Sequence, residues 1–336
     1  MTRPLLEIER LRVTFAGPAK QRLAAVEDLS LAIDAGEALI IVGESGSGKT
    51  LTALSILGLA PATADVQGAI WFAGIDLSGL GERQLRQIRG RDIAMIYQDP
   101  MSALDPVWSI ESQISETIRA HEDTSRAHAT RRAIALLERV GLPEPSRIAR
   151  AYPHELSGGM RQRALIAMAL ACSPKLLIGD EPTTALDVTI QAQILELLRD
   201  LRRDLGLTLL LITHDMGVAA DIADRVLVMY AGRAVEVGEV TRIFRAPRHP
   251  YTEALLQSAE LGGLVPKTPL LAIPGVPPPI DARPPGCAFH PRCPRAQTIC
   301  ADERPELIGD DSETAACFFP LTTGSGAVGA ASTSDG

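Results

Sequence analysis

The sequence predicts an α/β protein built around a parallel sheet, and three observations carry this prediction. Short apolar runs alternate along the chain with longer runs of helical periodicity. Residues 38–42 are apolar at every position, which is typical of a strand buried on both faces. Of the 336 residues, 46% are hydrophobic and 22% are charged, enough for a sizeable core. This composition excludes disordered, collagen-like and coiled-coil chains.

The first 75 residues are expected to form mostly short strands. Residues 7–15 and 26–33 alternate loosely, and residues 67–72 follow a glycine-containing loop. The buried run at 38–42 leads through a glycine-rich turn into a helix predicted over 49–59. Further along the chain, apolar runs predict strands at residues 93–97, 176–178, 208–212 and 226–229. Helical patterns lie between them, at residues 113–120, 126–140, 159–171 and 189–204.

The expected organisation is a domain over residues 1–255, an extension over 256–320 and a disordered tail over 321–336. The block from about 100 to 155 is mostly helical in pattern, which indicates an inserted helical subdomain. Six prolines between Pro274 and Pro285 exclude a helix there. The tail residues are small and polar.

Net charge argues against nucleic acid as a partner. The chain has 33 basic and 41 acidic residues, hence a net charge of −8, and only 4% aromatic residues. No apolar run approaches the length of a membrane-spanning helix, and Glu7 comes too early for a signal peptide. We expect a cytoplasmic protein that can still dock on a membrane protein.

A phosphate-binding loop is predicted directly after the buried strand. The motif G-x-x-x-x-G-K-[ST] is spelled by Gly43, Glu44, Ser45, Gly46, Ser47, Gly48, Lys49 and Thr50. Its glycines let backbone N–H groups approach phosphate oxygens. Lys49 adds a positive charge, and the Thr50 hydroxyl can bind Mg²⁺. A plain glycine turn that caps a helix is the alternative, but it does not explain the Lys-Thr ending after a strand.

A second acidic element follows another apolar strand. Asp180 and Glu181 end the run Leu176–Ile178, and the carboxyl end of a strand is where open α/β sheets bind ligands. Asp180 would hold Mg²⁺, and Glu181 would act as general base on the attacking water.

The third element indicates the family. Leu156-Ser157-Gly158-Gly159-Met160 resembles the LSGGQ signature of ATP-binding cassette (ABC) ATPases, with Met160 in place of Gln. A Ser and two glycines at a helix N-terminus can bind an anion, although Ser157 would also cap the helix. The resemblance implies a RecA-like P-loop NTPase fold (an ABC cassette) with an antiparallel β subdomain, a helical insert and a Cys-rich C-terminal extension.

The resemblance assigns further roles over residues 5 to 250. It implies that Phe15 stacks on adenine, that Gln98 reaches Mg²⁺ and the attacking water, and that His214 contacts the γ-phosphate. Asp187 falls in the D-loop. Taken alone, Phe15 fits a core residue, and Gln98 and His214 fit ordinary loop residues. The family mechanism places each ATP between the phosphate loop of one cassette and the signature of another.

Four stretches resemble the ATPases of oligopeptide/dipeptide importers, which include nickel-type relatives. They are residues 97–106, 152–156, 183–189 and the element His249-Pro250-Tyr251-Thr252. Residues 43–57 resemble the D-type subunit. The implied partners are a second, non-identical ATPase, two transmembrane permeases and an extracytoplasmic solute-binding protein. The chain would lie on the cytoplasmic face of the inner membrane and couple through residues 98–108.

Four of the five cysteines lie near the C-terminus: Cys287, Cys293, Cys300 and Cys317. In a reducing cytosol such a tetrad favours metal ligands over disulfides. Some importer ATPases of this kind carry a [4Fe–4S] cluster, so the resemblance implies one here. Zn²⁺ and four free thiols are the alternatives. Cys172 lies in an apolar helical run and is expected to be a small core residue.

Other functions use the same cassette motifs. A nickel or other solute importer would share nearly all of them, and so would a soluble ABC ATPase of DNA repair, translation or regulation. Those soluble proteins usually carry two cassettes or long coiled-coil insertions, whereas this chain has one cassette.

Overall fold

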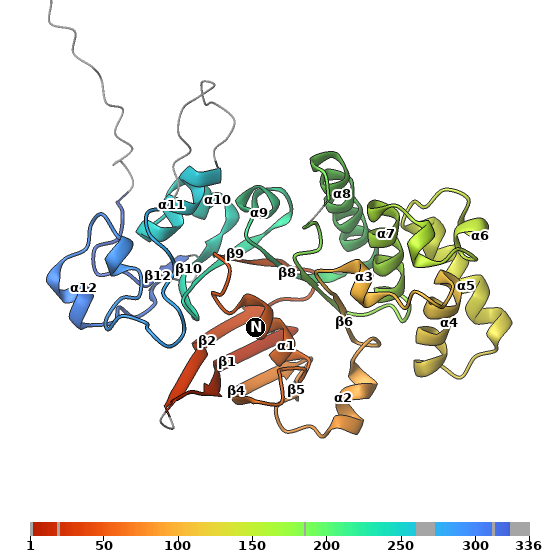
Figure 1. The fold of residues 1–336 in the computed structure, drawn as a ribbon, viewed down its shortest axis with the longest axis horizontal. Helices are drawn as coiled ribbons and strands as arrows, with labels where there is room; N and C mark the ends of the chain where they lie inside the picture. The colour runs from red at the N-terminus through yellow and green to blue at the C-terminus, as the bar shows by residue number, and fades with distance from the viewer. Residues whose placement is uncertain (1–2, 19–20, 185, 260–272, 311–312, 323–336) are drawn as a thin grey trace, which may run out of the picture.

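The computed structural model describes residues 3–18, 21–184, 186–259, 273–310 and 313–322. Its strands are β1 (Leu6–Ala16), β2 (Arg22–Ile33), β3 (Ala38–Val42), β4 (Ala64–Phe72), β5 (Ile75–Asp76), β6 (Ile93–Ile96), β7 (Leu176–Asp180), β8 (Thr208–Thr213), β9 (Arg225–Tyr230), β10 (Arg233–Glu239), β11 (Ile308–Asp310) and β12 (Glu313–Ala315). They form two sheets (Figure 1). One has four strands in the order β2-β1-β4-β5, and the other has eight in the order β11-β12-β10-β9-β3-β8-β7-β6.

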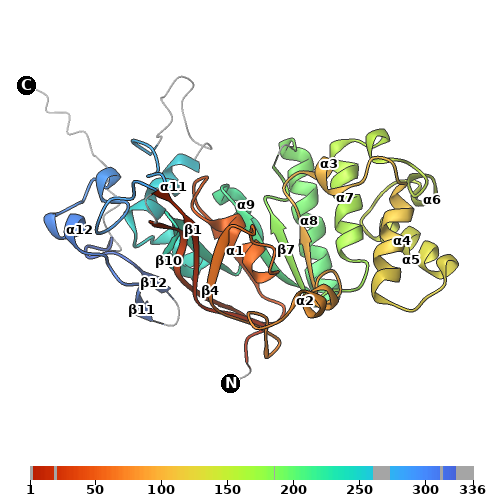
Figure 2. The same ribbon diagram turned by 60° about the horizontal axis from the view of Figure 1, so that its bottom comes forward.

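The helices are α1 (Lys49–Ile56), α2 (Glu82–Ile88), α3 (Pro100–Ala103), α4 (Ile110–His121), α5 (Arg126–Arg139), α6 (Pro145–Ile148), α7 (Gly158–Ala169), α8 (Val188–Leu205), α9 (Met216–Ile222), α10 (Val240–Arg245), α11 (Pro250–Ala259) and α12 (Thr298–Asp302). The described residues also include the 3₁₀ turns η2 (Pro153–Glu155) and η3 (His290–Arg292). The helical insert predicted near residues 100–155 is present as α3 to α6, at the opposite end of the molecule from α12 (Figures 1 and 2).

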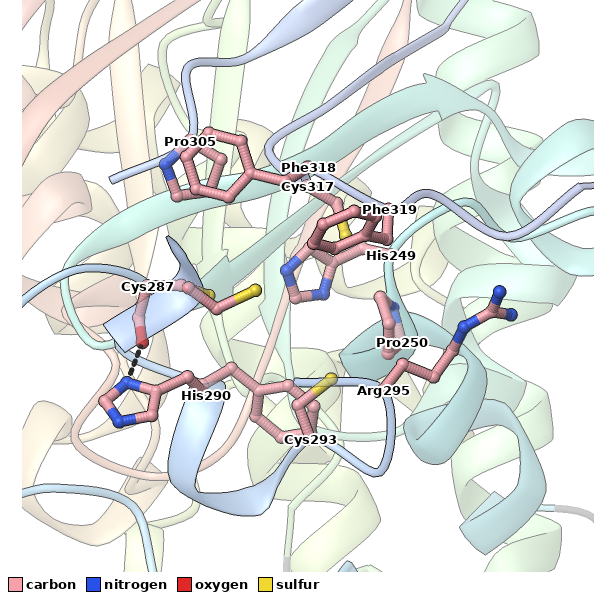
Figure 3. A pocket seen from close by; sticks show the side chains of 12 residues that line it. His249, Pro250, Cys287, His290, Cys293, Arg295, Pro305, Cys317, Phe318 and Phe319 are labelled. Carbon is pink, nitrogen blue, oxygen red and sulfur yellow. Dashed lines mark hydrogen bonds between the residues drawn. The ribbon is translucent and has the colours of Figure 1, made fainter. Parts of the chain in front are cut away.

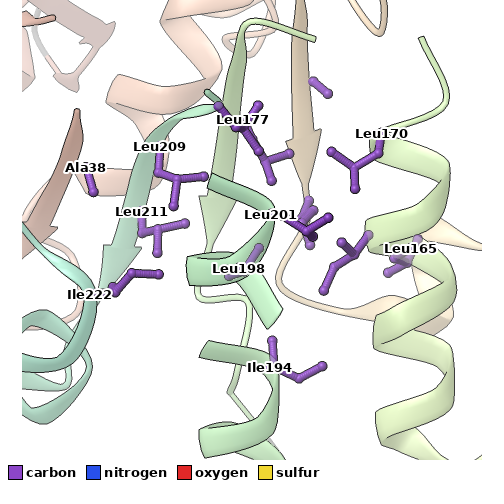
Figure 4. Close-up of a cluster of buried hydrophobic side chains, with 14 of the residues drawn as sticks. Ala38, Leu165, Leu170, Leu177, Ile194, Leu198, Leu201, Leu209, Leu211 and Ile222 are labelled. Atoms are coloured by element: carbon purple, nitrogen blue, oxygen red, sulfur yellow. The ribbon is translucent and has the colours of Figure 1, made fainter. Parts of the chain in front are cut away.

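The large sheet is covered on both faces, which explains why β3 is apolar at every position. Ala38, Ile40 and Val42 join the core beneath α7, α8 and α9, while Leu39 and Ile41 join the core shared with α1 and the antiparallel sheet. All five residues are at most 1% exposed. In Figure 4 the leucines of β7 and β8 face Ile194, Leu198 and Leu201 of α8. The parallel sheet expected from the alternation of strands and helices is confirmed over β6, β7, β8, β3 and β9.

The C-terminal extension adds to the large sheet instead of packing as a separate body. Strand β12 pairs antiparallel with β10, with Glu236 opposite Ala315. Phe289 is 1% exposed and belongs to the same core as α8 and α9. The residues on the two sides of the boundary expected after residue 255 therefore share one sheet and one hydrophobic core.

The range predicted for the tail begins at a residue with a defined partner. Leu321 is buried, and its N–H donates to the Arg248 carbonyl at 2.8 Å. Residues 323–336 of the predicted disordered tail lie outside the described residues. The segment from Pro274 to Pro285 contains no helix, as its prolines predict. The helix predicted over 49–59 ends at Ile56, before Gly58 turns into the left-handed region at φ +61°.

Candidate functional site

The phosphate loop joins β3 to α1 at the carboxyl edge of the sheet. Gly43 and Gly48 have φ of +155° and +102°. A Cβ on Gly43 would lie 2.1 Å from the Met229 carbonyl oxygen, and one on Gly48 would lie 3.0 Å from the Ala25 carbonyl oxygen. Only glycine fits both positions, so the close packing against β9 and β2 requires the glycines that the motif supplies.

Lys49 lies across this loop with a side chain that is almost completely buried. Its Nζ donates to the carbonyl oxygens of Gly43, at 2.7 Å, and Glu44, at 3.0 Å. Burial lowers the pKa of Lys49, while the nearby carboxylates of Glu181, Asp180 and Glu44 oppose that shift. The ammonium group is thus bound to the loop itself. The Ser47 hydroxyl is buried without a hydrogen-bond partner in the part of the chain that the structure describes.

Two of the three residues expected to bind Mg²⁺, Thr50 and Asp180, are in contact. The Thr50 hydroxyl donates to Asp180 Oδ1 at 3.0 Å. Asp180 ends β7 and is 4% exposed. Burial raises the pKa of Asp180, against the hydrogen bond from Thr50. A hydroxyl and a carboxylate at this distance form a donor set that suits Mg²⁺.

Glu181 is the centre of a small polar network. Its Oε2 accepts from Gln98 Nε2 at 3.1 Å and from the Thr184 hydroxyl at 2.8 Å, and its Oε1 lies 3.2 Å from His214 Nδ1. Burial alone raises the pKa of Glu181, but the hydrogen bonds from Thr184 and His214 and the charge of Lys49 outweigh it and hold that pKa below its usual range. Glu181 is therefore a carboxylate at neutral pH, the form that a general base requires.

A cavity of about 450 Å³ opens in front of this network, and its lining includes Gly43, Glu44, Ser45, Gln98, Glu181, His214 and Leu255. The structure thus brings the first residues of the phosphate loop together with all three residues expected to be catalytic. Thr50 and Asp180 are linked to this group by Lys49, because the Lys49 ammonium interacts with the carboxylates of both Asp180 and Glu181.

Other expected binding residues lie outside this cavity. Phe15 is half-buried near the end of β1, paired with Leu23. Ser157 caps α7 and accepts from the Met160 N–H at 3.3 Å, with Gly158 and Gly159 forming the first turn. Asp187 caps α8 by accepting from the Ile190 N–H at 2.9 Å. Neither the signature nor the D-loop aspartate lines the cavity; Ala185 of the D-loop lies outside the described residues.

Sequence reasoning missed two residues that hold Glu44. The Glu44 N–H donates to the Tyr251 hydroxyl at 2.8 Å, and Arg292 donates to both Glu44 carboxylate oxygens, at 2.6 and 3.0 Å. The resemblance drew attention to Tyr251 through its His-Pro-Tyr-Thr element, without a role. Nothing in the pattern around Arg292 distinguishes it from the other arginines.

The four C-terminal cysteines line one small cavity together with His249, Phe289 and Phe319 (Figure 3). Burial raises the pKa of Cys287 to about 11 and also raises the pKa values of Cys293 and Cys317. None of the five cysteines forms a disulfide, including the half-buried Cys172. Among the described residues, no group of three or more His, Cys, Asp or Glu side chains is arranged to hold a metal ion. The predicted metal centre stays a prediction.

Comparison with known proteins matches both parts of the chain. Residues 26–184 match the family model "ABC transporter", and residues 235–300 match "Oligopeptide/dipeptide transporter, C-terminal region". The oligopeptide transport ATP-binding protein OppD of Salmonella typhimurium is 46% identical over 94% of this chain and 94% of its own length. OppD of Escherichia coli is 45% identical over the same shares.

Solved structures agree with this assignment. The ATP-binding cassette MJ0796, in a dimeric post-hydrolysis state bound to ADP and phosphate, superimposes with a TM-score of 0.63 at 28% identity, over 70% of this chain and 98% of that one. No helix in the described ranges is both long and apolar enough to cross a membrane. The chain belongs to the ABC transporter family, as an ATP-binding cassette that carries the oligopeptide/dipeptide transporter C-terminal region.

Proposed function

We propose that this chain hydrolyses ATP to power the import of oligopeptides or dipeptides through a membrane permease. The observation that carries the proposal is the Glu181 network, in which an ionised carboxylate faces the phosphate-loop cavity between Gln98 and His214. Similarity to OppD over nearly the whole chain supports the peptide substrate.

In this proposal each residue of the site has a separate role in ATP hydrolysis. The phosphate loop and Lys49 would bind the β- and γ-phosphates, and Thr50, Asp180 and Gln98 would hold Mg²⁺, which would neutralise the phosphate charge. Glu181 takes the proton of the attacking water, and His214 contacts the γ-phosphate. Phe15 stacks on adenine.

A second cassette completes each site. Ser157, Gly158 and Gly159 lie at the exposed start of α7, away from the cavity of their own chain, so they are free to meet the ATP of another chain. Asp187 would lie at the same interface. The resemblance to D-type subunits favours a non-identical partner cassette, and ATP held between two helix N-termini would keep the pair closed.

Exposed apolar side chains support docking on a permease. Tyr97, Met101, Val107 and Trp108 are 42–72% exposed, and all lie on the segment that follows β6. Large apolar side chains gathered on one surface segment mark interaction sites. We propose that this segment meets two permease subunits at the cytoplasmic face of the inner membrane, in an importer that also uses an extracytoplasmic solute-binding protein.

The test is transport by the assembled importer. The chain is purified with the permeases and second cassette from its own genome and reconstituted in liposomes with the binding protein. Labelled tripeptide uptake should require ATP on the cytoplasmic side and should stop with Glu181→Gln. ATP hydrolysis without membrane association, or uptake of nickel but not of peptide, would overturn the import of peptides.

We further propose that Cys287, Cys293, Cys300 and Cys317 bind a [4Fe–4S] cluster, with Zn²⁺ as the alternative. Their lining of one cavity supports a shared ligand set. Four thiolates are the donor set of such a cluster, which would serve as a structural link in the extension. The thiols must lose their protons and their side chains must rearrange, because they do not form a metal-binding group as they stand.

Anaerobic purification followed by iron, sulfide and zinc assays tests this second proposal. About four irons and four sulfides per chain, lost in Cys293→Ser but retained in Cys172→Ser, would support the cluster. Zinc alone would replace it with the Cys₄ zinc site. A colourless, metal-free protein that still hydrolyses ATP would remove both.

A further inference from the structure

The C-terminal extension reaches the phosphate loop through one arginine. Arg292 donates Nη1 and Nη2 to the two carboxylate oxygens of Glu44, at 2.6 and 3.0 Å. The two residues are 248 positions apart in sequence. Glu44 is the second residue of the phosphate loop and lines the cavity in front of Glu181.

The arginine itself is firmly held. Its side chain is 5% exposed. Nε donates to the Pro274 carbonyl at 2.7 Å, Nη1 also donates to the Tyr230 hydroxyl at 3.2 Å, and the guanidinium lies 5.8 Å from the ring centroids of Tyr230 and Phe289. A planar guanidinium that makes a two-point contact with a carboxylate fixes the direction of that carboxylate as well as its charge.

Tyr251 holds the backbone of the same loop residue. Its hydroxyl accepts from the Glu44 N–H at 2.8 Å, and its ring lies 4.6 Å from that of Tyr230 and 5.2 Å from that of Phe289, between ring centroids. Tyr251 is fully buried. The loop is therefore held at Glu44 by side chain and by backbone, in both cases from residues beyond the nucleotide-binding motifs.

Glu44 poses an electrostatic problem for a loop that must accept a polyphosphate. A carboxylate in a partly buried site repels the phosphates, because little water screens the two charges. Arg292 cancels this charge and turns the carboxylate toward the extension. Lys49 donates to the backbone carbonyl of Glu44, while the Glu44 carboxylate accepts from Arg292.

We propose that Arg292 is a positioning residue for ATP binding, which neutralises Glu44 and orients it away from the phosphates. Because Arg292 ends the 3₁₀ turn between Cys287 and Cys293, the packing of the cysteine-bearing loop sets the ATP affinity of the cassette. This inference rests on the proposed nucleotide site and deepens it.

The test measures binding of a non-hydrolysable ATP analogue with Mg²⁺ by titration calorimetry on the full-length chain. Arg292→Gln should weaken binding about tenfold or more, because it leaves Glu44 charged and unpaired. The affinity of Arg292→Lys should lie between those of the wild type and Arg292→Gln, since an ammonium restores the charge but not the two-point contact. Arg83→Gln, an equal charge change at an exposed position of α2, is the matched control and should bind as wild type.

The double variant separates an electrostatic role from a merely structural one. In Glu44→Gln, the further change Arg292→Gln should cost less than about threefold, because no carboxylate is left to neutralise. An equal loss in both backgrounds would mean that Arg292 only holds the extension together, and would overturn the inference. So would Arg292→Gln binding like wild type.

Two further outcomes distinguish a failure of the proposed function or of folding from a failure of the inference about Arg292. If the wild-type chain does not bind the analogue, the proposed function fails and not only this inference. If Arg292→Gln does not fold, as judged by circular dichroism, Arg292→Lys and Tyr251→Phe carry the test. Tyr251→Phe removes only the hydroxyl that accepts from Glu44, and binding by both variants that is equal to wild type would overturn the proposal.

Discussion

The phosphate-loop cavity and the cysteine cavity differ in how far the side chains around each are already in contact with one another. Around the first, Thr50 donates to Asp180, and Gln98 and His214 both contact the Glu181 carboxylate. Around the second, the four thiols share a cavity, yet they form no metal-binding group.

The difference follows from how each site is encoded. The phosphate loop is one continuous segment whose glycines have no room for a Cβ against the neighbouring strands, so local sequence determines its shape. The cysteines are spread over residues 287–317 in a segment with few regular elements, so their arrangement depends on tertiary packing. The polar groups of the first site are already in contact with one another, while the four thiols of the second are not arranged as a ligand set.

The comparison is tested most strongly at Glu181. Glu181→Gln should lower steady-state phosphate release by about 10²- to 10⁴-fold, because an amide cannot accept the proton of water. Binding of the ATP analogue should survive. Glu196→Gln on the exposed face of α8 is the control. Turnover close to wild type would mean that the preformed network is not the catalytic one.

The next largest effect is expected where the extension enters the core. Phe289→Ala should lower the free energy of unfolding by about 3–5 kcal/mol, because it leaves a cavity against Tyr230 and Tyr251. Urea unfolding followed by circular dichroism measures the loss. Ile308→Ala removes an apolar side chain that is 66% exposed and should change stability by less than about 0.5 kcal/mol. Equal effects would show that the extension packs independently of the cassette.

The junction of β10 with the extension should depend on pH. Burial raises the pKa of Glu236 to about 7, against the N–H groups of Arg248 and His249 that donate to it. The folded chain thus keeps a proton that the unfolded chain loses above about pH 4.5, so this residue's contribution to stability falls as pH rises toward 7.

Glu236→Gln should remove that dependence. Its free energy of unfolding relative to wild type should rise by about 3 kcal/mol between pH 4.5 and pH 8, the shift of the pKa expressed as energy. Urea titrations at several pH values measure it, with Glu239→Gln at the exposed end of β10 as control. A difference that stays constant with pH would contradict the raised pKa.

The smallest effect is expected at Thr184, and it tests whether the hydrogen bond from Thr184 tunes Glu181. Thr184→Ala removes one hydrogen bond to Glu181, worth about 1 kcal/mol, so kcat should fall about fivefold. Since that bond lowers the pKa of Glu181, the acid limb of the pH–rate profile should move to higher pH. The exposed Thr189→Ala is the control, and an unchanged acid limb would separate Thr184 from the general base.

Sequence patterns predicted the elements that are long, periodic or tied to a motif. The run at 38–42 and the helices α4, α5, α7 and α8 were expected close to their observed positions. Strand β12 was not, because Glu313, Thr314 and Ala315 carry no strand pattern and are ordered by pairing with β10. The helices α9, α10 and α11 were missed as well, since each is short and is buried by tertiary packing.

The site was predictable to the extent that its residues come from named motifs. Gln98, Glu181 and His214 follow three separate strands, and the parallel sheet brings their ends together. Arg292 has no such position. Its pairing with Glu44 depends on the path of the extension back across the molecule, which no local spacing encodes.

The distance in sequence between Glu44 and Arg292 has a consequence during synthesis. A ribosome adds about 5–20 residues per second, so the phosphate loop leaves it roughly 12–50 s before its partner arginine. Through that interval the nascent cassette holds an uncompensated Glu44. On the role proposed for Arg292, a chain that ends before this residue keeps its ATP motifs but binds nucleotide weakly.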